Sequence, residues 1–290
     1  NGLRAIGNSV MPLVFLGVSV VLNIVLDLIF IVKFNLGVAG AAEATVISQY
    51  VSGMGITIYA LLKSTHFRIK LKHLKFDINI VKELANLSIL TALQQSVMNF
   101  GILLVQGLVN SFGTVVMAAF AAAVKIDTLA YSPVQDFGNA VSTFVAQNYG
   151  AGKKERIFKS VRICLAMAVA VCGGIVLFLA IFCHPLFSIF TTDQNVINIG
   201  IDMLRFMAPC YTIYVFIEVL SGALRGTGDV LLPTLITLGG VCLIRIPWIM
   251  FVLPAHHTTT CVMLSYPISW ITTTALIIPY YLYRKKHAYD

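Results

Sequence analysis

The stretch LRGTGDVLLP (residues 224–233) has a near copy at the start of the chain, LRAIGNSVMP (residues 3–12). In both copies a Leu-Arg pair is followed by a Gly three residues after the Arg, by a Pro five residues further on, and then by a long apolar run. Gly permits a tight turn and Pro is favoured at the start of a helix. Each copy therefore predicts a turn that leads into a membrane helix. Duplicated halves of this kind are typical of secondary transporters, whose substrate path lies between the halves.

The composition places the chain among integral membrane proteins. Of its 290 residues 58% are hydrophobic and 11% are charged, and the mean hydropathy is +0.89. A soluble domain of this length needs more polar surface, whereas a helix that crosses a bilayer needs only about 20 apolar residues. The net charge is +8, and the basic residues that cause it are confined to alternate loops, as in a membrane protein of fixed topology. We therefore expect the lipid bilayer as a partner and no nucleic acid.

Eight apolar runs are long enough to span a membrane as helices. A transmembrane barrel would instead show segments of about ten residues with alternating polarity. The sequence therefore predicts an all-α integral membrane protein, a polytopic helix bundle. The predicted spans are residues 11–33, 38–62, 87–112, 114–147, 157–183, 196–224, 231–253 and 260–283.

The basic residues predict how the chain is oriented. The loops on one side have Lys33 as their only basic residue. The loops on the other side have the basic residues of 63–82, 153–162 and 284–286 together with Arg4 and Arg225. Loops rich in Lys and Arg face the cytoplasm. We therefore expect a multi-pass protein of the cell membrane with both ends of this chain in the cytoplasm.

The repeat also predicts how the chain divides into lobes. Residues 11–62 correspond to residues 231–283, whereas residues 87–224 have no earlier counterpart. We therefore expect about four further helices upstream, and a complete protein with twelve spans in two pseudo-symmetric six-helix lobes. The predicted parts are the end of the N-terminal lobe with two transmembrane helices (1–62), a cytoplasmic linker between the lobes (63–86) and a C-terminal six-helix lobe (87–290).

Asn23, Asp27 and Thr45 form the predicted site for a coupling cation. An ionisable group in mid-membrane costs roughly 2.5 to 3.5 kcal/mol on insertion scales, so Asp27 is a functional candidate. Asn23 lies one helical turn from it, and Thr45 lies at a similar depth on the next helix. Oxygen ligands of this kind suit Na⁺, and the carboxylate of Asp27 alone could take a proton. The alternative is a polar pair that only ties two helices together.

A second set of polar residues predicts a substrate cavity. Gln95, Asn99, Gln106 and Asn110 recur at helical spacing and form one polar stripe. Such a stripe either lines a water-filled cavity for organic cations or bonds to neighbouring helices. On the next span, Lys125 and Asp136 lie near Pro133, which removes a backbone hydrogen bond and bends a helix. The predicted cavity residues are Gln95, Asn99, Gln106, Lys125 and Asp136.

Enzyme motifs are missing from the sequence. Residues 150–154 resemble a phosphate-binding loop, but Gln147 stands where the motif needs Gly and Lys154 where it needs Ser or Thr. We therefore expect no ATP site. The six cysteines form no C-x-x-C pair, and neither H-E-x-x-H nor G-x-S-x-G occurs. We expect no enzyme, and no cofactor other than Na⁺ or H⁺ as the coupling ion.

Three features together resemble the multidrug and toxic compound extrusion family. They are the run QNYGAGK (residues 147–153) with Arg156, the twin Leu-Arg-x-x-Gly turns, and the pair Asn23 and Asp27. The resemblance runs from end to end. It implies a twelve-helix exporter that exchanges Na⁺ or H⁺ for small organic cations or drugs and opens alternately to either side.

The resemblance also implies roles for individual residues. In relatives with a cation site in the N-terminal lobe, an Asp on the first helix joins Asn-x-x-x-Asp on the fifth and Thr on the sixth. Asn23, Asp27 and Thr45 match the last two parts, and the first helix has no counterpart in this chain. Other relatives have an acidic residue on the seventh helix, where this chain has Gln94 and Gln95.

Two alternatives to a cation-coupled drug exporter remain open. A lipid-linked oligosaccharide flippase of the same superfamily should have several cationic residues facing its cavity, and only Lys125, Arg205 and Arg245 are available. A membrane-embedded enzyme should show a convergent acid-base or metal set, and the sequence shows none. The exporter is therefore the favoured function.

Overall fold

The computed structural model describes residues 2–63, 77–255 and 258–287. These residues are helical apart from short turns, and no strand occurs among them. Eight helical segments are long and apolar enough to cross a membrane, which confirms the predicted polytopic bundle. The eight spans are Val10–Lys33, Gly37–Lys63, Ser88–Phe112, Thr114–Gly150, Lys154–Ser188, Gln194–Gly226, Leu231–Ala255 and Thr259–His287.

The chain forms two compact units, residues 1–78 and 79–290, and each is described by itself. Helix α4 begins at Ile78. The last part of the segment expected as a linker (residues 78–86) is therefore helical, and its residues 64–76 lie outside the described residues. The division into the end of one lobe, a linker and a second lobe stays a prediction.

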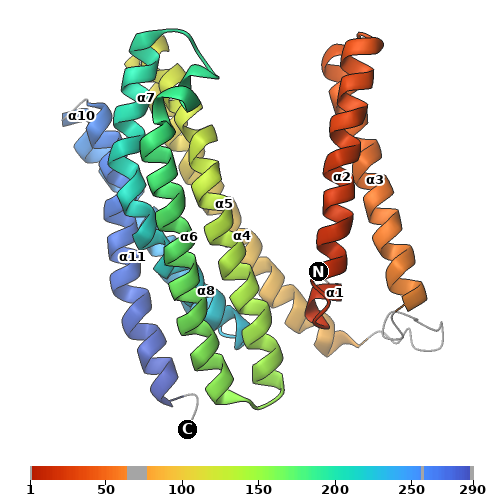
Figure 1. Ribbon diagram of the computed structural model, residues 1–290. Coiled ribbons are helices and arrows are strands. Elements are labelled where there is room, and N and C mark those ends of the chain that lie inside the picture. The colour runs from red at the N-terminus through yellow and green to blue at the C-terminus, as the bar shows by residue number, and fades with distance from the viewer. Residues whose placement is uncertain (1, 64–76, 256–257, 288–290) are drawn as a thin grey trace. The chain divides into compact units, whose positions relative to one another are not determined.

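Unit 1 is a helical hairpin (Figure 1). After the short α1 (Gly2–Ala5), α2 (Val10–Asp27) continues as a π-helix (Leu28–Lys33), and α3 (Gly37–Lys63) returns along it. The Ser52 hydroxyl donates to the Phe15 carbonyl at 2.8 Å, and the Phe15 and Tyr59 rings lie 6.3 Å apart. Asp27 is the last residue of α2, at the point where the α-helix becomes a π-helix. Such an irregularity is frequent at functional sites.

Unit 2 contains the remaining six spans. The third and fourth are α4 (Ile78–Val109), which ends in a 3-10 turn (Asn110–Phe112), and α5 (Thr114–Gly150). The fifth span is α6 (Lys154–Ser188), and the sixth consists of α7 (Gln194–Met207) and α8 (Tyr211–Gly226), joined by the 3-10 turn Ala208–Cys210. The seventh consists of α9 (Leu231–Gly239), the π-helices η6 (Gly240–Arg245) and η7 (Trp248–Val252), and α10 (Leu253–Ala255). The eighth is α11 (Thr259–His287).

Helix α8 lies at the centre of unit 2, where it packs against α5, α6 and α11. Tyr211 and Tyr214 on α8 are among the most completely buried large side chains. Contact with α5 is close because Gly222 faces the backbone of Gly138. Small residues at helix interfaces let backbones approach in membrane proteins. The seam between α5 and α8 thus determines which side chains of both helices face inward.

The two copies of the repeat form the same turn. In the first copy the Gly7 amide donates to the Arg4 carbonyl at 3.0 Å and the Asn8 amide to the Leu3 carbonyl at 2.9 Å. In the second copy the Gly228 amide donates to the Arg225 carbonyl at 3.0 Å and the Asp229 amide to the Leu224 carbonyl at 3.1 Å. Both glycines have positive φ, +89° and +86°, as a Schellman helix end requires. The predicted turns are confirmed, and the equivalence of the two lobes stays a prediction.

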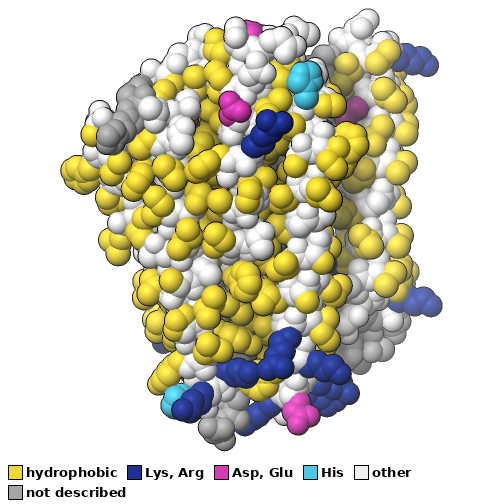
Figure 2. Space-filling view, turned by 60° about the vertical axis from the view of Figure 1, so that its left-hand side comes forward, with side chains coloured by type: hydrophobic (Ala, Val, Ile, Leu, Met, Phe, Trp, Pro, Cys, Tyr) yellow, Lys and Arg dark blue, Asp and Glu magenta, His cyan; other side chains and the backbone are white. Residues whose placement is uncertain are grey.

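Most of the basic residues of unit 2 lie at one end of the bundle, where α6 has Lys and Arg in its first turns and α8 and α11 have them in their last turns. Lys285 at the end of α11 lies 5.0 Å from the Phe158 ring near the start of α6. Arg284 Nε lies 2.9 Å from Asp229 Oδ2 in the turn after α8, and the Tyr280 hydroxyl donates to the same carboxylate. Figure 2 shows Lys and Arg side chains clustered at the lower end of a largely apolar face. This arrangement fits the predicted topology, and the cytoplasmic location of this end stays a prediction.

Candidate functional site

Unit 2 contains a partly open cavity of about 180 Å³. Its wall is mostly apolar and includes four methionines, whose flexible side chains adapt to ligands of different shape. Two charged side chains, Asp127 and Arg245, reach it. The lining residues are Met98, Ile102, Phe120, Ala123, Val124, Asp127, Thr128, Tyr131, Met203, Leu204, Met207, Tyr211, Arg245, Met263, Tyr266 and Trp270.

Asp127 supplies the negative charge of the cavity. Its neighbours at helical spacing on α5, Ala123 and Ala130, are buried, so the carboxylate lies on the inward face of the helix. The Tyr211 hydroxyl donates a hydrogen bond to Oδ1 of Asp127. The second carboxylate oxygen accepts no hydrogen bond from the described residues. A half-buried carboxylate with one oxygen free can hold a cationic group.

Aromatic rings form one wall of the cavity. Tyr131, Tyr211, Tyr266 and Trp270 line it. Tyr214 packs behind them: its ring stacks on Tyr131 with centroids 4.7 Å apart and lies 5.4 Å from Trp270, which is itself 5.9 Å from Tyr211. Tyr266 meets Trp270 edge-on at 6.1 Å. The faces of such rings attract cations and stack on flat ligands. The wall and Asp127 together suit a flat organic cation.

Arg245 reaches the cavity from the end of the π-helix η6. Only 4% of its surface is exposed, and its Nη2 donates to the Ser269 hydroxyl on α11 at 2.8 Å. Its guanidinium lies over the Tyr266 ring at 4.3 Å. The cavity therefore also contains a fixed positive charge.

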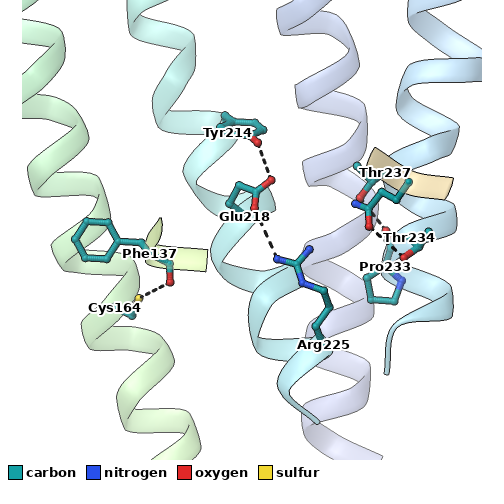
Figure 3. A network of polar contacts seen from close by, with 9 residues as sticks. Phe137, Cys164, Tyr214, Glu218, Arg225, Pro233, Thr234 and Thr237 are labelled. Atoms are coloured by element: carbon teal, nitrogen blue, oxygen red, sulfur yellow. Dashed lines mark hydrogen bonds and ion pairs between the residues drawn. The ribbon is translucent and has the colours of Figure 1, made fainter. Parts of the chain in front are cut away.

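A polar network lies beside the aromatic wall (Figure 3). The Tyr214 hydroxyl donates to Glu218 Oε1 at 2.6 Å, and Arg225 Nη2 lies 3.8 Å from Glu218 Oε2. Because Tyr131 stacks on Tyr214, this network touches the cavity through one ring. Nearby, the Thr234 hydroxyl on α9 donates to Gln94 Oε1 on α4 at 3.3 Å. The two partners of Glu218, Tyr214 and Arg225, both lie on its own helix α8.

The residues that the sequence predicted for the substrate cavity lie elsewhere on unit 2. Gln95, Asn99 and Gln106 are exposed on α4, and Lys125 and Asp136 are exposed on α5, so none of the five lines the 180 Å³ cavity. The inward face of α4 carries Val105 and Val109, and the amide stripe lies on the flank of the helix. That the stripe faces the space between the lobes stays a prediction.

In unit 1 the structure brings together two of the three predicted coupling residues. The Asn23 amide Nδ2 lies 3.4 Å from Thr45 Oγ1, which itself donates to the Ala41 carbonyl at 2.9 Å. Asp27 lies one turn further along α2. Its Oδ1 is buried and has no hydrogen-bond partner among the described residues. An unpaired buried carboxylate oxygen is costly, which makes Asp27 a natural acceptor for a proton or a cation.

Sequence reasoning missed the aromatic half of the cavity. Asp127 and Arg245 were both recognisable as ionisable residues inside spans, and the aromatic residues around them gave a further indication. Tyr and Trp in membrane helices are enriched at the interfaces. Their recurrence within the spans, at Tyr131, Tyr211 and Trp270, could therefore have drawn attention to a polar interior.

Comparison with known proteins places these features in a family. The family model described as MatE matches residues 89–251. A probable multidrug resistance protein YoeA of Bacillus subtilis is 27% identical over 98% of this chain and 64% of its own length. A probable multidrug resistance protein NorM of Thermotoga maritima is 30% identical over 84% of this chain and 53% of its own. These matches confirm the resemblance found in the sequence.

A solved structure supports the fold. A MOP superfamily transporter from Pyrococcus furiosus superposes with a TM-score of 0.86 at 20% identity, over 94% of this chain and 62% of the other. At this identity the likeness concerns the fold alone. The chain spans between 53 and 64% of the length of the two multidrug resistance relatives.

Proposed function

The chain belongs to the MatE family, and on this premise we propose that the protein is a cation-coupled antiporter that exports aromatic organic cations by alternating access. The observation that carries the proposal is the cavity of unit 2, in which a carboxylate stands beside a wall of aromatic rings. A flat cation gains from both, because its charge meets Asp127 and its faces meet Tyr and Trp rings.

The cavity suits ligands of varied shape. Four methionines are among the residues that line it, and flexible side chains of this kind accommodate ligands of different outline. Its volume is below the roughly 300 to 1,000 Å³ of drug-sized sites. The cavity would therefore take one ring system, or one end of a larger compound, in this conformation.

Asp27 is the proposed coupling carboxylate. Its buried Oδ1 has no partner in the described part of unit 1, and Asn23 and Thr45 supply further oxygens nearby. A proton or a Na⁺ on this carboxylate would remove the cost of the unpaired charge and favour one conformation of the hairpin. Export against a gradient follows if drug and coupling ion favour different conformations.

Fluorescence of Trp270 tests the cavity. The chain has two tryptophans, so Trp248→Phe leaves Trp270 as the only reporter. We expect the planar aromatic cation ethidium to quench it. Asp127→Asn should weaken binding by at least about tenfold, because an interaction with a charged group contributes about 1.5 to 3 kcal/mol. Asp202→Asn, a change of the same kind at an exposed position of α7, should leave binding unchanged. Equal binding by the Asp127→Asn and Asp202→Asn variants would refute this site.

An imposed gradient tests the coupling. In proteoliposomes we expect ethidium export to accelerate with either an inward Na⁺ gradient or an inward pH gradient, and the responsive gradient names the coupling ion. An export rate that is the same with and without each gradient would contradict the antiport proposal.

The flippase alternative has less support. A diphosphate-linked substrate calls for several cationic side chains, and within the described residues Arg245 is the one Lys or Arg that lines the cavity. Lys125 and Arg205, the other two cations available in the sequence, are exposed on α5 and α7.

A further inference from the structure

The start of α6 and the end of α11 bring positive charges together at one end of unit 2. Both helices pack against α8, and Lys285 Nζ of α11 lies 5.0 Å from the Phe158 ring of α6. Residues 153–162 and 284–286 include eight Lys and Arg but only one acid, Glu155. Figure 2 shows Lys and Arg side chains gathered at this end. Unit 2 therefore has an excess of positive charge here.

The protein itself compensates little of this charge. Arg284 is paired with Asp229. By contrast, no carboxylate of the described residues lies within 4.0 Å of a side-chain nitrogen of Arg162 or Lys285. Helix stability does not account for the cations near the start of α6 either, because positive charge in the first turn opposes the helix dipole. An anion from outside the chain would therefore bind favourably at this end.

The charges lie where the apolar parts of both helices end. Residues 163–188 of α6 and 259–283 of α11 contain no Asp, Glu, Lys or Arg. Arg162 is one helical turn, about 5.4 Å along the axis, from Phe158. Because Phe158 contacts Lys285, the two boundaries lie at nearly the same level. Exposed large hydrophobic side chains follow directly on both helices, among them Ile163, Met167 and Leu282.

We propose that this end of unit 2 is a binding site for an anionic phospholipid, whose phosphate is held by Arg162 and Lys285 and whose acyl chains lie on the apolar surface of α6 and α11. Basic pockets between transmembrane helices bind anionic head groups in this way. A zwitterionic lipid carries a cation beside its phosphate, and that cation is repelled by the same basic residues. The site is separate from the 180 Å³ cavity, whose lining includes neither Arg162 nor Lys285.

Titration of the purified, delipidated protein with lipid tests the proposal. Native mass spectrometry counts the lipids that stay bound and gives an affinity for phosphatidylglycerol and for phosphatidylcholine. One Lys or Arg near the membrane surface strengthens the binding of an anionic lipid about fivefold. With two such cations we expect phosphatidylglycerol to bind at least about tenfold more tightly than phosphatidylcholine. Equal affinities for the two lipids would overturn the proposal.

Variants then assign the preference to the two helix ends. Arg162→Gln and Lys285→Gln should each weaken phosphatidylglycerol binding about fivefold and leave phosphatidylcholine binding unchanged. Arg162→Lys keeps the charge and should retain most of the affinity. Lys82→Gln, which removes one positive charge from an exposed position of α4, should have no effect. Equal losses in Arg162→Gln and Lys82→Gln would indicate diffuse attraction to a basic surface and overturn the site. If Lys285→Gln does not fold, the comparison of Arg162→Gln with Lys82→Gln still decides.

A soluble head group distinguishes a lipid from a free phosphate. Glycerol phosphate has the same charged group as phosphatidylglycerol but no acyl chains to lie on the apolar surface. At constant ionic strength we expect it to leave bound phosphatidylglycerol in place. Displacement of the lipid by glycerol phosphate at equal concentration would assign the site to a soluble phosphate and overturn the lipid assignment.

Discussion

Replacing Gly222 with alanine should separate α5 from α8 and destabilise unit 2. A Cβ at Gly222 would press against the carbonyl oxygen of Gly138 and lie 3.0 Å from Val141 Cγ1. The carbonyl is part of the α5 backbone and cannot rotate away as a side chain would. The helices must therefore move apart, and the buried contacts along the seam weaken.

The magnitude follows from two opposing contributions. Alanine favours a helix over glycine by about 0.8 to 1.0 kcal/mol. Overpacking in a well-packed interior costs about 1 to 3 kcal/mol. Gly173→Ala on α6 gains the helix propensity without the cost of overpacking, because no atom lies within 4 Å of the added Cβ. The Gly222→Ala variant should therefore be less stable than the Gly173→Ala variant by about 1 to 3 kcal/mol, or about 5-fold to 150-fold in the folded-to-unfolded ratio.

Reversible unfolding by SDS in mixed micelles measures this difference, with helicity followed by circular dichroism. Both variants are compared with the unaltered protein under the same conditions. Equal unfolding free energies for the two variants would show that α5 and α8 do not touch at Gly222, and the description of the central seam would be wrong.

Three further predictions concern the turns and the cavity. Gly7→Ala and Gly228→Ala should each cost about 1 to 2 kcal/mol of unfolding free energy, because both positions have positive φ; a large difference between the two costs would contradict the shared turn. Asp229→Asn should cost about 1 kcal/mol by weakening the ion pair with α11, and unchanged stability in the SDS assay would count against it. Tyr211→Phe should weaken ethidium binding about 3-fold to 10-fold by loss of the hydrogen bond to Asp127, and an unchanged affinity would show that Tyr211 does not orient this carboxylate.

The spans and the twin turns could be predicted because each depends on local sequence. A run of apolar residues is helical in a bilayer whatever surrounds it. The turn at residues 224–229 is likewise local, since Gly228 and the carbonyls it caps are close in sequence. The pairing of Asn23 with Thr45 could also be anticipated, because consecutive helices joined by a short turn pack side by side.

The cavity could not be predicted in this way, because it depends on how each helix is rotated. The amide stripe on α4 looked like a lining, yet Val105 and Val109 occupy the inward face. On α5 the close contact at Gly138 turns Asp127 inward, while Lys125 and Asp136 remain exposed. Rotations of this kind follow from contacts between residues far apart in sequence. Periodicity alone does not reveal them.

The most direct test of the account is gradient-driven export by Asp27→Asn in sealed proteoliposomes. Ethidium efflux is followed with and without the gradient that drives the unaltered protein, at matched protein content. We expect Asp27→Asn to insert and fold but to lose all acceleration by the gradient, with Asn23→Ala and Thr45→Ala losing less. Glu43→Gln, an exposed acid on the neighbouring helix α3, should respond normally. Full gradient-driven export by Asp27→Asn would contradict the central claim.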